Sequence, residues 1–169
     1  MIETPRSQFE SLTPQEKTRV IPATSVIIFD GDSFLAFRFA KGTTVGEGKV
    51  GIPGGPNDID LKTGDLESGY QTGVREIREE TALMTKPESL SPFDGNNFTH
   101  DMGKNGSSKI MDWTLYYSHE FSGEIQDLQP DEGRAEWMKI QDFFNLPDEK
   151  VAPNAKLALL YALIHSANN

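Results

Sequence analysis

Residues 75–83 read R-E-I-R-E-E-T-A-L, and this stretch decides how the rest of the chain is interpreted. Glu76, Glu79 and Glu80 stand at i, i+3 and i+4, a spacing that places three side chains on one face of a helix. Like charges at this spacing repel each other by roughly 0.2–0.5 kcal/mol per pair on an exposed helix. A sequence that keeps this repulsion either solvates a surface or gathers carboxylate oxygens for a hard cation.

The surrounding sequence predicts that this stretch belongs to a well-capped helix. Ser68 and Gln71 form the pattern of a capping box at its start. Its expected buried stripe has the spacing 4, 3, 4 and consists of Tyr70, Val74, Ile77 and Thr81. At roughly 100° per residue the three glutamates fall on the flank, so we expect their carboxylates to point out of the core. Gly73 costs about 1 kcal/mol relative to Ala inside a helix, which is understandable if another backbone packs close at that point.

The composition restricts the possible functions. The chain has 169 residues and a net charge of −10, which argues against general binding to nucleic acids or anionic membranes. It contains no cysteine, which excludes disulfides, thiolate metal sites and a cysteine nucleophile, and which fits a cytoplasmic protein. No apolar run approaches ~18 residues, and the first residues lack the pattern of a signal peptide.

The order of elements predicts an α+β fold with a mixed sheet and helices packed on it. The expected strands cover residues 23–30, 33–40, 50–53, 98–100, 110–121 and 136–140. The first two strands should form a hairpin, and so should the strands on either side of the turn at 101–109. A helical turn at 141–145 and a last helix after Asn154 should follow. The expected buried face of that helix consists of Leu157, Leu160, Tyr161 and Ile164.

Residues 1–21 are expected to form an N-terminal arm or short helix, and residues 22–167 a single domain. Thr13 with Pro14 predicts a helix start in the arm, either as a surface helix or as a segment that pairs with another subunit. In the strand at 33–40, Phe34, Ala36 and Arg38 share one face and Leu35 shares the other face with Phe37. Arg38 is a lone charge in this apolar strand, and it is interpreted either as an edge residue or as a phosphate ligand.

The chain resembles the Nudix hydrolases, whose box is G-x5-E-x7-R-E-U-x-E-E-x-G-U, with U an aliphatic residue. Glu67 is followed by seven residues and then by the quoted stretch, which fits the second half of the box position by position. G-K-V-G-I-P-G-G at 48–55 and E-W-M-K-I-Q-D-F-F-N-L-P at 136–147 also look like stretches of that family. The resemblance covers roughly residues 22–165. It implies an α/β/α sandwich with a mixed sheet.

Two departures from the box stand out. Eleven residues separate Gly55 from Glu67 where the pattern has five, so the intervening loop carries about six additional residues. This insertion borders the expected site and could displace the glycine pair Gly54–Gly55 relative to the metals. Ala82 stands where the box has its last glycine, which predicts a small local adjustment at the end of the helix.

The resemblance implies hydrolysis of a pyrophosphate bond in a nucleoside diphosphate linked to another group, with Mg²⁺ or possibly Mn²⁺ as the cofactor. The implied metal ligands are Glu76, Glu79, Glu80 and the carbonyl of Gly55. Arg75 would orient the glutamates, and Glu67 would be a structural or outer ligand. Phosphoryl transfer needs neutralised charge and a positioned water more than covalent chemistry, which agrees with this set of residues.

The loop at 124–136 is expected to supply a further catalytic carboxylate, with Glu132 as the first choice and Glu136 as the alternative. Arg38, Lys49 and Gly54 are the expected substrate-binding residues. The partner is then a small nucleotide, and a homodimer remains open. The substrate marker that some Nudix subfamilies carry past the box is absent near residues 98–100. The competing hypotheses are a non-catalytic Nudix-fold domain that binds or senses nucleotides, and a Nudix-type enzyme of other chemistry.

Overall fold

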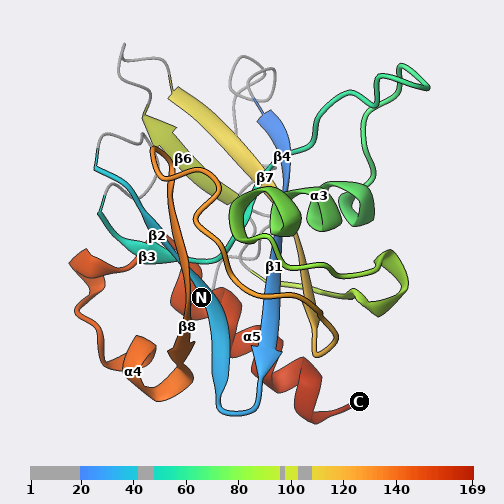
Figure 1. Ribbon diagram of the computed structural model, residues 1–169. Coiled ribbons are helices and arrows are strands. Elements are labelled where there is room, and N and C mark those ends of the chain that lie inside the picture. Colours follow the sequence, from blue (N-terminus) through green and yellow to red (C-terminus); the bar gives the residue numbers. More distant parts are fainter. Residues whose placement is uncertain (1–19, 42–47, 96–97, 103–107) are drawn as a thin grey trace.

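The computed structural model describes residues 20–41, 48–95, 98–102 and 108–169 (Figure 1). The expected helix start at Thr13 and most of the glycine-rich loop at 41–49 lie outside the described residues. Within the described part of the chain, no helix is both long enough and apolar enough to cross a bilayer.

An eight-stranded mixed sheet forms the centre of the molecule, in the order β3-β2-β1-β7-β5, with β4 beside β1, β6 beside β7 and β8 beside β2. The strands are β1 (Val20–Asp30), β2 (Ser33–Phe39), β3 (Val50–Gly51), β4 (Gly54–Pro56), β5 (Ser91–Phe93), β6 (Phe98–Met102), β7 (Ser108–Ser118) and β8 (Gly133–Lys139). The pair β1–β7 is parallel and the other pairs are antiparallel. Both predicted hairpins are confirmed.

The helices cover opposite faces of the sheet. They are α3 (Gly69–Thr81), α4 (Ile140–Asn145) and α5 (Ala155–Ala167), and two 3-10 turns lie at Pro87–Ser89 and Asp148–Lys150. In Figure 1, α3 crosses in front of β1 whereas α5 passes behind it, and α3 contacts β1 and β4 while α5 contacts β7 and β5. The predicted α+β sandwich is confirmed.

Alternate residues of β1 and β2 divide the core into two clusters. Phe34 and Ala36 belong to the cluster under α5, whereas Leu35 and Phe37 belong to the cluster under α3, as their alternation predicts. Residues 23–29 of β1 are all buried, because helices cover the central strand on both faces. On the α3 side, a Cβ added to Gly73 would lie 2.8 Å from Val26 Cγ2, so the close neighbours at this glycine are side chains and not the expected backbone.

The buried face of α5 differs from the predicted stripe. The sheet buries Ala155, Ala158, Leu159 and Ala162. Leu160 and Ile164, which were expected in the core, keep 45% and 49% of their surface exposed. Leucines occur on several sides of this helix, so apolar spacing alone does not identify its buried face. The short alanine side chains let α5 approach the sheet closely, and they decide the orientation.

Candidate active site

The helix that carries the three glutamates begins and ends as its residues dictate. Gln71 N–H donates to Ser68 Oγ (3.3 Å), and Ser68 N–H donates to Gln71 Oε1 (2.8 Å), which confirms the capping box. At the other end Ala82 adopts a left-handed conformation with φ 64°, and its N–H donates to Arg78 O (3.0 Å). The chain therefore leaves the helix through the geometry that glycine favours, at a cost of roughly 1–2 kcal/mol for the alanine side chain.

Two of the three glutamates are buried, so the prediction that they point out of the core is wrong for Glu76 and Glu80. Their exposed fractions are 9% and 7%, whereas the side chain of Glu79 remains 39% exposed. The predicted stripe is also wrong at Tyr70, which is 39% exposed. Glu76 and Glu80 are buried because β4 packs beside α3 and covers the side of the helix next to its apolar stripe.

The glycine pair of β4 makes this close approach possible. Gly54 N–H donates to Glu80 Oε2 (2.9 Å), and a Cβ added to Gly55 would lie 2.5 Å from Glu76 Oε1. Both glycines remain against the glutamates despite the insertion, and their displacement relative to the metals stays a prediction.

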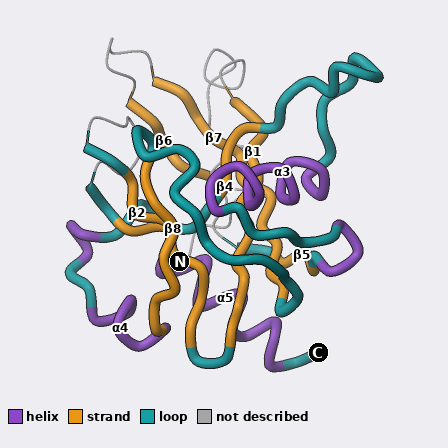
Figure 2. Tube along the Cα trace, viewed as in Figure 1, coloured by secondary structure: helices purple, strands orange, loops and turns teal. Residues whose placement is uncertain are grey.

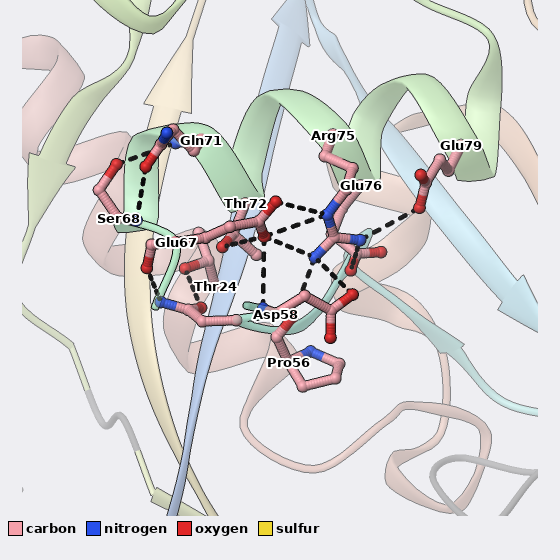
Figure 3. A network of polar contacts seen from close by, with 11 residues as sticks. Thr24, Pro56, Asp58, Glu67, Ser68, Gln71, Thr72, Arg75, Glu76 and Glu79 are labelled. Atoms are coloured by element: carbon pink, nitrogen blue, oxygen red, sulfur yellow. Dashed lines mark hydrogen bonds and ion pairs between the residues drawn. The ribbon is translucent and has the colours of Figure 1, made fainter. Parts of the chain in front are cut away.

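Arg75 links the glutamates to one another (Figure 3). Its Nη1 donates to Glu76 Oε1 (2.7 Å) and to Glu79 Oε2 (3.1 Å). Its Nε and Nη2 donate to Glu67, with the shortest contact between Nη2 and Oε2 at 2.9 Å. Burial acts to raise the pKa of Glu67, but hydrogen bonds from Arg75 and Thr72 outweigh it and leave that pKa lowered. Arg75 is thus a fixed positive centre within a ring of carboxylates.

The insertion supplies a carboxylate that sequence reasoning missed. Asp58 Oδ2 lies 3.5 Å from Arg75 Nη2, and its negative charge contributes to raising the pKa of Glu76. The available signal was the position of the insertion directly before Glu67. Nothing in the spacing of its residues distinguished this aspartate from Asp60 or Asp65, which the same loop contains.

The carboxylates concentrate negative charge at the edge of β4. Burial raises the pKa of Glu80 well above its usual range, and the charges of Glu76, Glu132 and Glu79 raise that pKa further. The hydrogen bond from Gly54 N–H acts in the opposite direction and lowers the pKa. Burial also raises the pKa of Glu76, although Arg75 opposes that effect.

These oxygen donors fit a hard divalent cation, whose charge would relieve both the burial and the repulsion. As the side chains stand, no three carboxylates or imidazoles among the described residues converge on one point, because Arg75 holds Glu76 and Glu79 and Gly54 holds Glu80.

The late-loop carboxylates occupy different environments. The loop at 119–132 passes the C-terminal end of α3, where Gln126 N–H donates to Thr81 O (3.1 Å; Figure 2). Glu132 is exposed on this loop, and its charge acts on Glu80. Glu136 lies on β8, where Arg38 Nη2 donates to its Oε1 (2.6 Å). Glu136 is thus paired with Arg38, whereas the charge of Glu132 acts on Glu80; the choice of Glu132 over Glu136 as the catalytic carboxylate stays a prediction.

The basic residues assigned to the substrate lie outside the carboxylate network. The interpretation of Arg38 as an edge residue is wrong, because Arg38 pairs with Arg134 of β8 on one side and with Val50 of β3 on the other. Lys49 is half-buried next to the end of β2, and Phe39 N–H donates to its carbonyl (3.0 Å). The phosphate-binding roles of Arg38 and Lys49 stay predictions, as does the role of Gly54, whose N–H is bound to Glu80.

A mostly apolar cavity of about 300 Å³ opens on the other side of the glycine pair. Gly54, Gly55 and Pro56 line one of its walls, and Phe39, Ile52 and Trp113 are among its apolar lining residues. The indole N–H of Trp113 donates to Thr99 Oγ1 (2.7 Å), which fixes the ring at the cavity wall. The same two glycines therefore separate the buried carboxylates from an apolar cavity.

Comparison with known proteins agrees with this geometry. The profile of the NUDIX domain matches residues 20–161. The chain belongs to the NUDIX family. Members generally hydrolyse pyrophosphate bonds in nucleotide-linked substrates and generally use divalent metal ions. No curated protein sequence shows significant similarity to the chain.

Solved structures show the same fold. The MutT NUDIX hydrolase from Burkholderia pseudomallei is 21% identical with a TM-score of 0.62, and the match covers 84% of this chain and 97% of that one. The NUDIX domain of NrtR from Shewanella oneidensis, solved with ADP ribose, is 16% identical with a TM-score of 0.61, and the match covers 99% and 100%. The MutT protein from Methanosarcina mazei Go1 is 16% identical with a TM-score of 0.60, covering 89% and 96%.

Proposed function

We propose that the protein hydrolyses a pyrophosphate bond in a nucleoside diphosphate linked to another group, with Mg²⁺ or Mn²⁺ as its cofactor. The observation that supports this proposal most directly is the position of the glycine pair of β4. The pair packs against buried Glu76 and Glu80 on one side and lines an apolar cavity on the other. A nucleotide-linked substrate has an apolar base and a charged diphosphate, and these two environments match its two ends.

The glutamates of α3 would hold the cation, which when bound neutralises phosphate charge and activates water. Without the ion, Arg75 pairs with Glu76 and Glu79 and offsets their mutual repulsion, and both carboxylates would pass from Arg75 to the cation when it binds. Glu132 is exposed and its charge acts on Glu80, so it is our candidate for the base that accepts the proton of the attacking water.

The base or sugar would occupy the cavity beside Trp113 and Phe39. Its volume of about 300 Å³ lies at the lower end of the range for small-molecule sites. Aromatic faces bind nucleobases of any type by stacking, so these two rings support a nucleotide without selecting one base. The NUDIX domain of the Shewanella protein, which has the same fold, binds ADP ribose.

The deciding experiment incubates the protein with a panel of nucleoside diphosphate derivatives and Mg²⁺ or Mn²⁺, and identifies the products by mass. We expect turnover that EDTA stops. Glu79→Gln and Glu80→Gln should each lower kcat by about 100-fold or more, since loss of an outer partner of a metal ligand already costs about 10–100-fold. Glu88→Gln is the matched control, because Glu88 is exposed in a 3-10 turn outside the site.

Full activity in both variants would refute the metal assignment. Saturable nucleotide binding without any turnover would instead support the non-catalytic binding or sensor domain. We also propose a cytoplasmic location, on the absence of cysteine and the net charge of −10. A homodimer is a further open proposal, which light scattering of the purified chain would test.

A further inference from the structure

The guanidinium of Arg75 has two differently occupied sides. Nη1 faces Glu76 and Glu79, which the proposed function assigns to the cation. Nη2 and Nε face Glu67, and Nη2 also faces Asp58 and the carbonyl of Pro56 (3.1 Å). The positive charge of Arg75 therefore lies between two pairs of carboxylates. Only one pair, Glu76 and Glu79, belongs to the expected metal ligands.

The two pairs must compete for Arg75. The Nη1 contact with Glu76 is the shortest ion pair of the network at 2.7 Å, and the side chain of Glu76 is buried. A divalent ion that binds Glu76 and Glu79 withdraws their charge from Arg75. The guanidinium is always ionised and its side chain is only 19% exposed, so it then needs compensation from its other side.

Asp58 is placed where its negative charge can compensate the charge of Arg75. Its main chain is tied to Glu67: Glu67 N–H donates to Asp58 O (2.8 Å), and Asp58 N–H donates to Glu67 Oε2 (3.3 Å). The preceding residue, Asn57, is tied to β1, since its N–H donates to Pro22 O (2.9 Å) and Thr24 Oγ1 donates to its Oδ1 (2.9 Å). The backbone at Asp58 is thus held in place although the rest of the loop projects from the body (Figure 1).

The side chain of Asp58 retains freedom that its backbone lacks. It is 65% exposed and its Oδ2 is 3.5 Å from Arg75 Nη2, which leaves room for a shorter contact than the present one. Glu67, by comparison, is already saturated by Arg75, by Thr72 Oγ1 (3.0 Å) and by Asp58 N–H. Among the described carboxylates that pair with Arg75, Asp58 therefore makes the longest contact.

We propose that Asp58 is a positioning residue, which draws Arg75 toward the insertion and so frees Glu76 and Glu79 for the divalent cation. This inference rests on the proposed function, because it assigns the insertion a part in loading the same site. The insertion thereby adds a fourth carboxylate around Arg75, and removing that carboxylate leaves Arg75 in stronger competition with the ion.

The test measures Mn²⁺ affinity of the purified full chain by electron paramagnetic resonance, without substrate. Asp58→Asn should weaken Mn²⁺ binding by about three- to tenfold. This is less than the loss expected on removal of a well-packed outer partner of a metal ligand, because the Asp58–Arg75 ion pair is long and partly exposed. Asp65→Asn removes the same charge from the same loop and should change the affinity less than about twofold. Asp58→Glu restores a carboxylate and should recover most of the affinity. Thermal melting in EDTA checks that each variant folds.

A second readout excludes a purely structural role. In the hydrolysis assay, Asp58→Asn should raise the Mn²⁺ concentration at half-maximal rate by the same factor while kcat at saturating Mn²⁺ stays within about twofold. Unchanged affinity in Asp58→Asn, or equal loss in Asp65→Asn, would overturn the inference while leaving the proposed function standing. A wild-type chain that neither binds Mn²⁺ nor hydrolyses the substrate panel would overturn both.

Discussion

Gly55→Ala is the sharpest test of how β4 positions the glutamates. The added Cβ would lie 2.5 Å from Glu76 Oε1 and 2.7 Å from its Cδ, whereas ordinary contacts begin at 3.4 Å. Glu76 Oε1 must therefore retreat by about 0.9 Å, the difference between 3.4 and 2.5 Å. The carboxylate is 9% exposed and is held by Arg75 Nη1 at 2.7 Å, so it cannot move without breaking that contact.

A displacement of this size exceeds the tolerance of about 0.5 Å for productive site geometry, and a 1 Å misplacement costs on the order of 100-fold in rate. We expect Gly55→Ala to lower kcat by about 10- to 100-fold and to weaken Mn²⁺ binding. The backbone at Gly55 is not in the left-handed region that favours glycine, so the loss of stability should come from overpacking alone, about 1–3 kcal/mol, as for the control below.

Gly73→Ala is the matched control, because it introduces a similar clash away from any carboxylate. Its Cβ would lie 2.8 Å from Val26 Cγ2 and 3.2 Å from Leu90 Cδ1. Overpacking costs about 1–3 kcal/mol of folding free energy, and the gain of about 1 kcal/mol in helix propensity offsets part of it. Gly73→Ala should therefore lower Tm while kcat stays near wild type. Wild-type kcat and Mn²⁺ affinity in Gly55→Ala would refute the reasoning.

Two further predictions concern the carboxylates. Glu132→Gln should lower kcat by about 100-fold with little change in KM, whereas Glu136→Gln should act mainly on stability because it breaks the ion pair with Arg38; the reverse order in steady-state kinetics would contradict the assignment. In EDTA, Tm should fall as pH rises above the usual glutamate pKa of 4.5. The raised pKa of Glu80 and of Glu76 means that protonation stabilises the fold fully below the usual value of 4.5, and this stability is lost as pH rises through the folded pKa. The lowered pKa of Glu67 acts only below about 4.5, outside this range. Glu80→Gln should flatten the slope, and a slope as steep as that of wild type in the variant would contradict the burial argument.

Local interactions explain why much of the fold was predictable. The capping box at Ser68, the hairpin between β1 and β2 and the alternating faces of β2 depend on residues within a few positions of one another. The buried face of α5 was not predictable in this way, because leucines and alanines occur on several sides of the helix. The helix packs close to the sheet, so the side that faces the sheet carries mostly the smaller alanine side chains.

The sequence by itself determined the family of this protein, because three glutamates and one arginine at the spacing of the Nudix box lie in one short stretch of the chain. Only the tertiary structure decided what surrounds them. It placed Gly54 and Gly55 against Glu80 and Glu76, which buries those two carboxylates, and it brought Asp58 to the far side of Arg75. The physical reason is that burial and charge compensation depend on segments which meet in space: periodicity along α3 contains no information about β4 or about the loop that precedes the helix.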